Sequence, residues 1–283
     1  MNKPLLFDGA FGTYYNNKTL NNQNPEFANI NDKEAVFNIH KEYILSGANA
    51  IKTNTFGANL TISTDYTVIK AIIKNGYNIA FRATSGTEVL VFADIGQINS
   101  ENAVVEYKEI VDCFINLGAT NFLFETLLEI ETLKPIIGYI KRTVSKSVII
   151  TSFAVSQDGY TKSGEYYKDL FELATNAGVD YVGLNCICGP AHMLNLLGKV
   201  NTQKYNLSIM PNSGYPTFVN GRTVYIDNPE YFSDKLYDIY CSGAKIIGGC
   251  CGTTPEHIKA IANKINSDAN SHIINFIHEQ EKC

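Results

Sequence analysis

Charged residues are scarce in this sequence, and neither sign dominates. They make up 18% of the 283 residues and leave a formal net charge of −5 at pH 7. A nucleic-acid-binding surface requires a basic field, and the composition contains neither such a field nor a strongly acidic tail. A small or neutral partner therefore fits this chain better than a nucleic acid.

Long apolar runs are also missing. No apolar stretch approaches the roughly 18 residues that a membrane span requires, and the apolar run in the opening MNKPLLFDGA is too short for a signal peptide. We therefore expect a cytoplasmic protein that does not contact a membrane. In that compartment the seven cysteines are expected to be thiols or metal ligands rather than a disulfide framework.

No linker, low-complexity stretch or block of like charge divides the chain. Hydrophobic residues make up 45% of it, which is enough to fill a substantial core and excludes extensive disorder. We predict a single domain over residues 1–268, followed by a C-terminal helix or tail over residues 269–283.

One pattern recurs four times along the chain. A stretch with helical spacing ends in a glycine, and a short apolar run follows and stops in polar or reactive residues. The glycines are Gly47, Gly118, Gly178 and Gly243. Further apolar runs at residues 5–8, 89–95, 147–155 and 207–212 bring the predicted strands to eight. The clearest helices are predicted over residues 66–82, 104–117, 129–141, 166–177, 191–200, 229–242 and 255–265.

Eight alternating β/α units over this length predict an α/β fold, the (β/α)8 TIM barrel, with a doubly wound open sheet as the alternative. In such a barrel the C-terminal ends of the strands form the active site. Those ends carry Asp8, Thr53, Asn54, Asp94, Glu125, Ser156 to Asp158, Asn185, Cys186, Asn212, Ser213, Cys250 and Cys251. Polar and soft side chains are therefore expected to converge on one face.

Three of these strand-end residues are cysteines. Cys250 and Cys251 lie side by side in GGCCG, and Cys186 ends the sixth predicted strand in GLNC. Adjacent side chains of a strand face opposite ways, so the pair can reach one ion only where the strand has ended and glycines let the backbone curl. Three thiolates at the barrel mouth would suit Zn²⁺ and leave its fourth tetrahedral position open.

Other interpretations of the cysteines stay open. Cys250 and Cys251 are also compatible with packed small apolar side chains or with a strained vicinal disulfide, and Cys188 is a competing ligand. Cys113 and Cys241 fall on predicted helices and are expected in the core, and Cys283 is terminal.

An open zinc site can activate water or bind a substrate thiol as thiolate. The sequence has no H-E-x-x-H motif, and its histidines fall in or beside predicted helices. Three anionic sulfurs also make zinc a poor Lewis acid for water. Alkyl transfer to sulfur is therefore the favoured chemistry.

Seven stretches spread over nearly the whole chain carry a family resemblance. They are LLFDGAFGTYY, GANAIKTNTFGAN, FLFETLLEIETLK, SFAVSQDGYTKSGE, GLNCICGP, MPNSGYP and GAKIIGGCCGTTPEHI. The sequence resembles the homocysteine S-methyltransferase domain family, zinc-dependent barrels shared by cobalamin-dependent methionine synthase, betaine-homocysteine methyltransferase and S-methylmethionine-dependent enzymes. The combination of GxNC with GGCCGTTP makes the resemblance highly specific.

The resemblance implies a homocysteine S-methyltransferase of methionine biosynthesis. It implies that Cys186, Cys250 and Cys251 bind Zn²⁺, and that the sulfur of L-homocysteine becomes the fourth ligand and attacks an activated methyl group as thiolate. It also implies that Asp8 and Glu125 hold the substrate ammonium.

Further substrate contacts are expected at two strand ends. Backbone N–H groups of Gly9, Ala10 and Phe11 are expected to receive the substrate carboxylate. Thr53 and Asn54 are expected to shape the pocket or the donor side, with simple loop hydrogen bonding as an equal alternative.

The methyl donor has to be inferred from other segments. The sequence departs from the family pattern at VFADIGQIN and at Asn121. The segment MPNSGYPTFVNGRTVYIDNPEYF is more similar to homocysteine domains fused to folate- or cobalamin-handling modules than to the S-methylmethionine-dependent enzymes. Because the sequence ends just after the eighth unit, we expect a stand-alone module that obtains the methyl group of methylfolate or methylcobalamin through a partner protein. The alternatives are a small sulfonium donor such as S-methylmethionine, a betaine donor, or a non-catalytic zinc-binding regulatory barrel.

Overall fold

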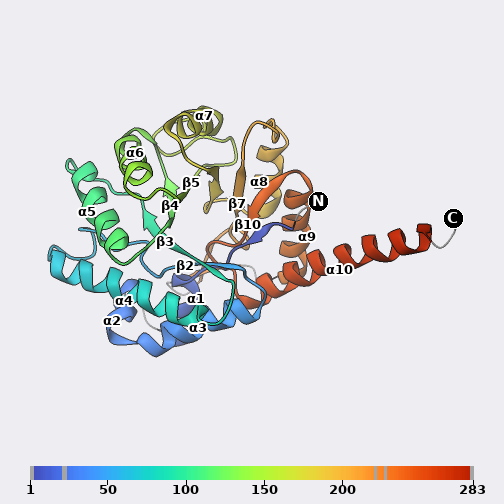
Figure 1. Cartoon of the computed structure of the whole chain (residues 1–283), viewed down its shortest axis with the longest axis horizontal. Helices are drawn as coiled ribbons and strands as arrows, with labels where there is room; N and C mark the ends of the chain where they lie inside the picture. Colours follow the sequence, from blue (N-terminus) through green and yellow to red (C-terminus); the bar gives the residue numbers. More distant parts are fainter. Residues whose placement is uncertain (1–2, 21–23, 220–221, 226–227, 281–283) are drawn as a thin grey trace.

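An eight-stranded parallel sheet, rolled into a barrel, forms the centre of the computed structural model (Figure 1). The structure describes residues 3–20, 24–219, 222–225 and 228–280. The strands of the barrel are β1 (Leu5–Leu6), β2 (Ala50–Lys52), β3 (Leu90–Gly96), β4 (Asn121–Leu127), β5 (Val148–Phe153), β6 (Tyr181–Asn185), β7 (Leu207–Met210) and β10 (Ala244–Ile247). All of them fall on apolar runs that the sequence predicts as strands, so the predicted TIM barrel is confirmed.

The barrel closes between β1 and β2, which lie at the two ends of the hydrogen-bonded order β1-β10-β7-β6-β5-β4-β3-β2. Phe7 forms a parallel bridge with Ala50. The N–H of Asn49 donates to Leu6 O at 2.8 Å, and the N–H of Asp8 donates to Ala50 O at 3.0 Å. These bonds exclude the open sheet and place the ends of β1 and β2 next to each other.

Helices alternate with the strands and surround the barrel (Figure 1). Those in predicted positions are α4 (Tyr66–Thr84), α5 (Ala103–Asn116), α6 (Lys134–Thr143), α7 (Tyr167–Ala177), α8 (Pro190–Leu197), α9 (Pro229–Cys241) and α10 (Pro255–Gln280). The four recurrent glycines, Gly47, Gly118, Gly178 and Gly243, have φ angles between 87° and 111°. Because L side chains disfavour this left-handed region, glycine lets each helix turn tightly into the next strand.

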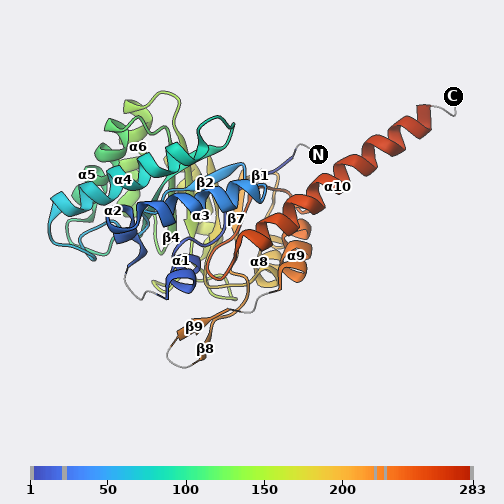
Figure 2. The ribbon, with the colours of Figure 1, turned by 90° about the horizontal axis from the view of Figure 1, so that it is seen from below.

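Several elements are not delimited by any sequence pattern. Between β1 and β2 lie α1 (Gly12–Thr19), η1 (Pro25–Phe27), α2 (Ala28–Asn31) and α3 (Lys33–Leu45), and a short helix η2 (Glu131–Leu133) precedes α6. An antiparallel hairpin of β8 (Thr217–Val219) and β9 (Arg222–Val224) follows β7. Figure 2 shows this hairpin projecting beyond the barrel on the same side as α1.

The 26-residue helix α10 runs outward from the barrel (Figures 1 and 2). The predicted boundary at residue 268 falls inside this helix, which continues to Gln280, and residues 281–283 lie outside the described residues. In the part of the chain that the structure describes, no helix combines the length and apolarity needed to cross a membrane.

One layer of apolar side chains fills the barrel interior, and a charged layer follows it toward the mouth. The apolar layer consists of Phe7, Ala50, Phe92, Leu123, Ile150, Met210 and Ile246, each at most 1% exposed. Because side chains alternate along a strand, the residues two positions further on also face inward. On β2, β3 and β4 those residues are Lys52, Asp94 and Glu125.

His40 on α3 gives the fold an acid-sensitive position. Its side chain is fully buried, and neither ring nitrogen has a hydrogen-bond partner among the described residues. Burial, with a smaller contribution from the charge of Lys52, lowers the pKa of His40 to about 3. The folded protein therefore keeps this ring neutral, whereas the unfolded chain takes up a proton below about pH 6.5.

Stability is consequently expected to fall as the pH drops below about 6.5, with a loss of about 2 kcal/mol from this group near pH 5. Urea unfolding at pH 7 and at pH 5 measures the effect, and the variant His40→Leu should lack this part of the pH dependence. The matched control His192→Leu changes a half-buried histidine on α8 and should retain it. Equal pH dependence in the wild type and in His40→Leu would contradict the prediction.

Candidate metal and substrate site

Three cysteine thiols meet at the mouth of the barrel. Cys186 directly follows β6, and Cys250 and Cys251 follow β10. Their sulfur atoms all lie within 4.8 Å of one another, and Cys186 Sγ is 3.8 Å from Cys251 Sγ. A tetrahedral Zn²⁺ with bonds of about 2.3 Å holds its sulfurs about 3.8 Å apart. The three side chains therefore fit one zinc ion and leave a coordination position for another ligand.

The other interpretations of the cysteines do not fit this geometry. Cys250 and Cys251 are free thiols rather than a vicinal disulfide, and both are partly exposed. Cys188 is buried and its thiol donates to Val155 O at 3.4 Å, outside the cluster. Cys113 is half-buried, and Cys241, which we expected in the core, is exposed at the end of α9. Cys283 lies outside the described residues.

The loop after β10 brings two adjacent thiols to the same side. Gly252 has a φ of 79°, and a Cβ on Gly249 would overlap Thr253 Oγ1. Thr253 Oγ1 donates to Cys250 O at 2.7 Å, and the N–H of Cys250 donates to Pro211 O at 2.8 Å. The predicted backbone curl is therefore present. Gly252 supplies its left-handed residue, and Gly249 lets the backbone pass close to Thr253.

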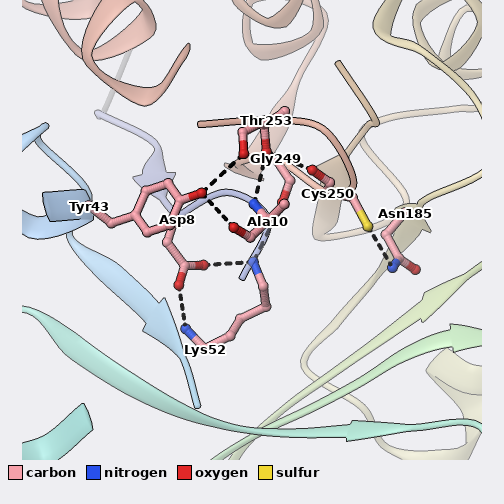
Figure 3. Close-up of polar contacts among 8 residues, drawn as sticks. All are labelled: Asp8, Ala10, Tyr43, Lys52, Asn185, Gly249, Cys250 and Thr253. Atoms are coloured by element: carbon pink, nitrogen blue, oxygen red, sulfur yellow. Dashed lines mark hydrogen bonds and ion pairs between the residues drawn. The ribbon is translucent and has the colours of Figure 1, made fainter. Parts of the chain in front are cut away.

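The backbone that carries Cys186 is strained. Cys186 and Ile187 both have a φ of 59°, and Thr126, across the site on β4, has a φ of 60°. Such angles cost a non-glycine residue roughly 1–3 kcal/mol and are found mainly at functional sites. Asn185 stabilises the arrangement, because its Nδ2 donates to Thr126 Oγ1 at 2.9 Å. Figure 3 shows the same Nδ2 directed at Cys250 Sγ, which is 3.8 Å away.

The thiols have unequal acidity. Hydrogen bonding with Cys186 and then with Cys250 lowers the pKa of Cys251 to about 3, while hydrogen bonding with Cys186 and Cys251 keeps the pKa of Cys250 well above its ordinary value. Within the trio, ionisation is therefore favoured at Cys251 over Cys250. A divalent cation bound there would favour the thiolate form of all three.

A cavity of about 400 Å³ opens directly onto the thiols. Among the predicted site residues, its wall contains Gly9, Ala10, Phe11, Thr53, Asn54, Glu125, Cys186, Cys250 and Cys251. Lys52, Asp94 and the rings of Phe56 and Pro25 also line it. Of the residues predicted to bind metal or substrate, all but Asp8 reach its wall. The other predicted strand-end residues Ser156 to Asp158, Asn185, Asn212 and Ser213 do not line it.

Comparison with known proteins assigns the chain to a family. The profile of the homocysteine S-methyltransferase family matches residues 5–265. The chain belongs to this family. Methionine synthase of Mycobacterium leprae is 27% identical and that of Mycobacterium tuberculosis is 28% identical, each alignment covering 91% of this chain and 24% of the relative. This chain therefore spans about a quarter of the length of these curated relatives.

Solved structures show the same fold. The metallated form of the homocysteine methyltransferase MmuM from Escherichia coli superposes with a TM-score of 0.73 at 20% identity, covering 92% of this chain and 96% of that one. The oxidized form of the same protein gives a TM-score of 0.74 with the same coverage. At this identity the likeness establishes the barrel alone.

In this homocysteine S-methyltransferase family member, Asp8 is held by Lys52. Lys52 Nζ lies 2.6 Å from Asp8 Oδ1, and the backbone N–H of Lys52 donates to Asp8 Oδ2 at 3.0 Å (Figure 3). Asp8 is 1% exposed and lies behind Lys52 rather than on the cavity wall. Although burial alone would lower it, the pKa of Lys52 is raised by the Asp8 carboxylate, so the two form an ionised buried pair.

Asp94 and Glu125 lie on adjacent strands in the same charged layer and are 4% and 6% exposed. Asp94 Oδ1 has no hydrogen-bond partner among the described residues. Burial, reinforced by Glu125, raises the pKa of Asp94 well above its usual range. Burial also raises the pKa of Glu125 to about 7, against the opposing charge of Lys52. The sequence places Asp94 at a strand end on the active-site face but assigns it no contact, and it assigns no role to Lys52. The spacing of two residues from buried apolar positions is the pattern that would have indicated both.

Thr53 and Asn54 line the cavity and also make structural hydrogen bonds. Thr53 Oγ1 accepts from the N–H of Asp94 at 3.0 Å, and Asn54 Nδ2 donates to Pro25 O at 2.8 Å and to Asn29 Oδ1 at 2.9 Å. Their positions are thus compatible with both predicted roles, which are shaping the pocket or the donor side and forming hydrogen bonds within the loops. A contact with substrate or donor stays a prediction.

The backbone after β1 is tied to the zinc-ligand loop. The N–H of Ala10 donates to Thr253 Oγ1 at 3.0 Å, and the hydroxyl of Tyr43 donates to Ala10 O at 2.6 Å (Figure 3). Because Thr253 already accepts from Ala10, Gly9 and Phe11 are the remaining candidates for backbone contacts to a substrate carboxylate.

Proposed function

We propose that this chain binds L-homocysteine and accepts a methyl group on its thiol, giving methionine. The observation that carries the proposal is the convergence of Cys186, Cys250 and Cys251 at one end of a cavity of about 400 Å³. Membership of the homocysteine S-methyltransferase family supports the choice of substrate. The size of the cavity is within the range typical of small-molecule sites.

The proposed cofactor is Zn²⁺, held by the three cysteine sulfurs. When bound there, Zn²⁺ would stabilise the thiolate form of a substrate thiol that is mostly protonated in water at neutral pH. Asn185 orients Cys250 by directing its amide N–H toward the sulfur, and Thr253 fixes the carbonyl of the same residue. These contacts hold the ligand sulfurs in position before substrate arrives.

The charges around the cavity suit an amino-acid thiol. Asp94 and Glu125 offer carboxyl groups to an ammonium, and the glycine-containing segment at Gly9 brings backbone close to the same space. Phe11 and Phe56 supply apolar surface for the methylene carbons. A substrate with a thiol at one end and an amino-acid group at the other would thus meet complementary groups along the cavity.

The proposed methyl donor is methylfolate or methylcobalamin, delivered by a partner protein. The support is the similarity to methionine synthases, of which this chain matches about a quarter. Purified protein assayed for methionine formation from homocysteine is expected to show little turnover with S-methylmethionine alone and to require a methylcobalamin- or methylfolate-carrying partner protein. Rapid methionine formation from S-methylmethionine alone would replace this donor by a sulfonium donor.

Homocysteine binding can be tested without knowing the donor. Calorimetry on zinc-loaded protein should show one homocysteine bound per chain, and repeating it in buffers of different ionisation enthalpy should show release of about one proton, because a thiol near pKa 8.5 gives up its proton on binding as thiolate. L-homoserine, the matched ligand with a hydroxyl in place of the thiol, should bind about a hundredfold more weakly, since it cannot ionise at this pH. Zinc binding without any homocysteine binding would favour a non-catalytic zinc protein.

A further inference from the structure

The position of Lys52 removes Asp8 from the set of groups that can meet a substrate. Both carboxylate oxygens of Asp8 are engaged by Lys52, one through Nζ and one through the backbone N–H. Lys52 lines the cavity, whereas Asp8 is buried behind it. A positively charged group entering the cavity would therefore meet the ammonium of Lys52 on this side and would be repelled.

The opposite electrostatic situation holds at Asp94. Its side chain is 4% exposed, lines the cavity, and has an oxygen, Oδ1, without a partner among the described residues. A buried carboxyl oxygen left unpaired is costly, and because this carboxyl belongs to the cavity wall, a ligand donor could remove that cost. Because Lys52 Nζ is hydrogen-bonded to Asp8, Lys52 acts on Asp94 and Glu125 only through its charge, and one lysine stands against three acids here.

The register of β3 and β4 places these two acids within reach of one cation. Asp94 on β3 is paired with Leu123 on β4, and Gly96 is paired with Glu125. Glu125 therefore lies on the neighbouring strand, two residues beyond the position opposite Asp94. An alkylammonium has three N–H donors pointing in different directions and can bond to carboxyl groups on two adjacent strands at once.

We propose that Asp94, acting together with Glu125, binds the ammonium group of the amino-acid thiol, and that Lys52 keeps Asp8 from contacting it. Asp8 is then a positioning residue that fixes Lys52. This inference rests on the proposed function and assigns the ammonium-binding part of that site. It changes the prediction for Asp8 and keeps the prediction for Glu125.

Three thiols that differ in one charged group each test the assignment. L-homocysteine carries both charges, 4-mercaptobutanoate lacks the ammonium, and 3-mercaptopropylamine lacks the carboxylate. Calorimetry on the zinc-loaded protein should show that Asp94→Asn weakens binding of homocysteine and 3-mercaptopropylamine by roughly ten- to hundredfold. Binding of 4-mercaptobutanoate should stay unchanged. Glu125→Gln should give the same selective loss, and Asp94→Ser serves as the second variant at this position if Asp94→Asn does not fold.

The control is Asp234→Asn, which removes an exposed carboxylate that pairs with Lys264 on the outer helix α9 and should leave all three affinities as they are. Equal loss for the three thiols in Asp94→Asn, or no loss for any of them, would overturn the assignment of Asp94. A wild-type protein that binds all three thiols equally well would also overturn it while leaving the proposed function intact. A zinc-loaded wild type that binds none of the thiols would instead defeat the proposed function, and this assignment with it.

Discussion

Replacing Cys251 by serine is expected to lower the zinc affinity by about a hundred- to thousandfold while the barrel stays folded. Structural four-ligand zinc sites bind with about 10–16 kcal/mol, which is about 2.5–4 kcal/mol for each ligand. A serine hydroxyl stays protonated at neutral pH and cannot replace the thiolate. Among the described residues, no further His, Cys, Asp or Glu belongs to this metal-ligating cluster. Competition with a chromophoric chelator measures the affinity, and circular dichroism reports the fold.

Cys188→Ser is the matched control for this experiment. Cys188 lies two residues from a proposed ligand, but its thiol donates to Val155 O, and a hydroxyl can make the same bond. Its zinc affinity should equal that of the wild type. If Cys188→Ser loses as much zinc as Cys251→Ser, or if Cys251→Ser loses none, the three-cysteine site is assigned to the wrong residues.

Replacing Lys52 by methionine is expected to destabilise the protein by about 3–5 kcal/mol at neutral pH. The substitution leaves the Asp8 carboxylate buried without its partner, and breaking a buried pair on one side has an effect of this size. The double variant Asp8→Asn with Lys52→Met should recover most of the loss, since neither charge is then buried. Urea unfolding of the wild type, both single variants and the double variant gives the coupling free energy.

The pH dependence of the Lys52→Met variant has a definite sign. Burial raises the pKa of Asp8, and removing Lys52 removes the charge that opposes this shift. A carboxyl whose pKa is raised on folding is stabilising at low pH and destabilising as the pH rises, so the loss should be smaller near pH 4 than near pH 8. The surface control is Lys141→Met, whose pair with Asp180 has the same N–O distance of 2.6 Å but is about a third exposed. That variant should lose about 1 kcal/mol or less. Equal losses at the two sites would contradict the argument from burial.

The sequence predicts the barrel well because each of its units repeats a local signal. Gly47, Gly118, Gly178 and Gly243 mark helix ends by a backbone requirement that acts within a few residues. Once the eight strands are known, barrel topology places Cys186 opposite Cys250 without any further information. The α1 to α3 region and the hairpin β8–β9 lack such a local signal, so the sequence does not delimit them.

The environment of the acids is what the sequence does not reveal. Asp8 and Lys52 are 44 positions apart and meet only because β1 and β2 close the barrel. Considered alone, Asp8 is a strand-end acid suited to a substrate, and its pairing depends on which residue the neighbouring strand presents. Asp94 shows the converse. It lies in a segment that departs from the family pattern, yet it lines the cavity, and its Oδ1 has no hydrogen-bond partner in the described part of the chain.

The bond from the Ala10 N–H to Thr253 Oγ1 joins residues 243 positions apart. During synthesis on the ribosome, the segment after β1 emerges early. Its partner Thr253 is added only after nearly all of the remaining chain has been synthesised. Contacts of such large sequence separation form late, because the loop they close is long. Nascent chains that stop before Cys250 should therefore be unable to retain zinc, however much helix and strand they have already formed, and metal capture would coincide with the final closure of the barrel.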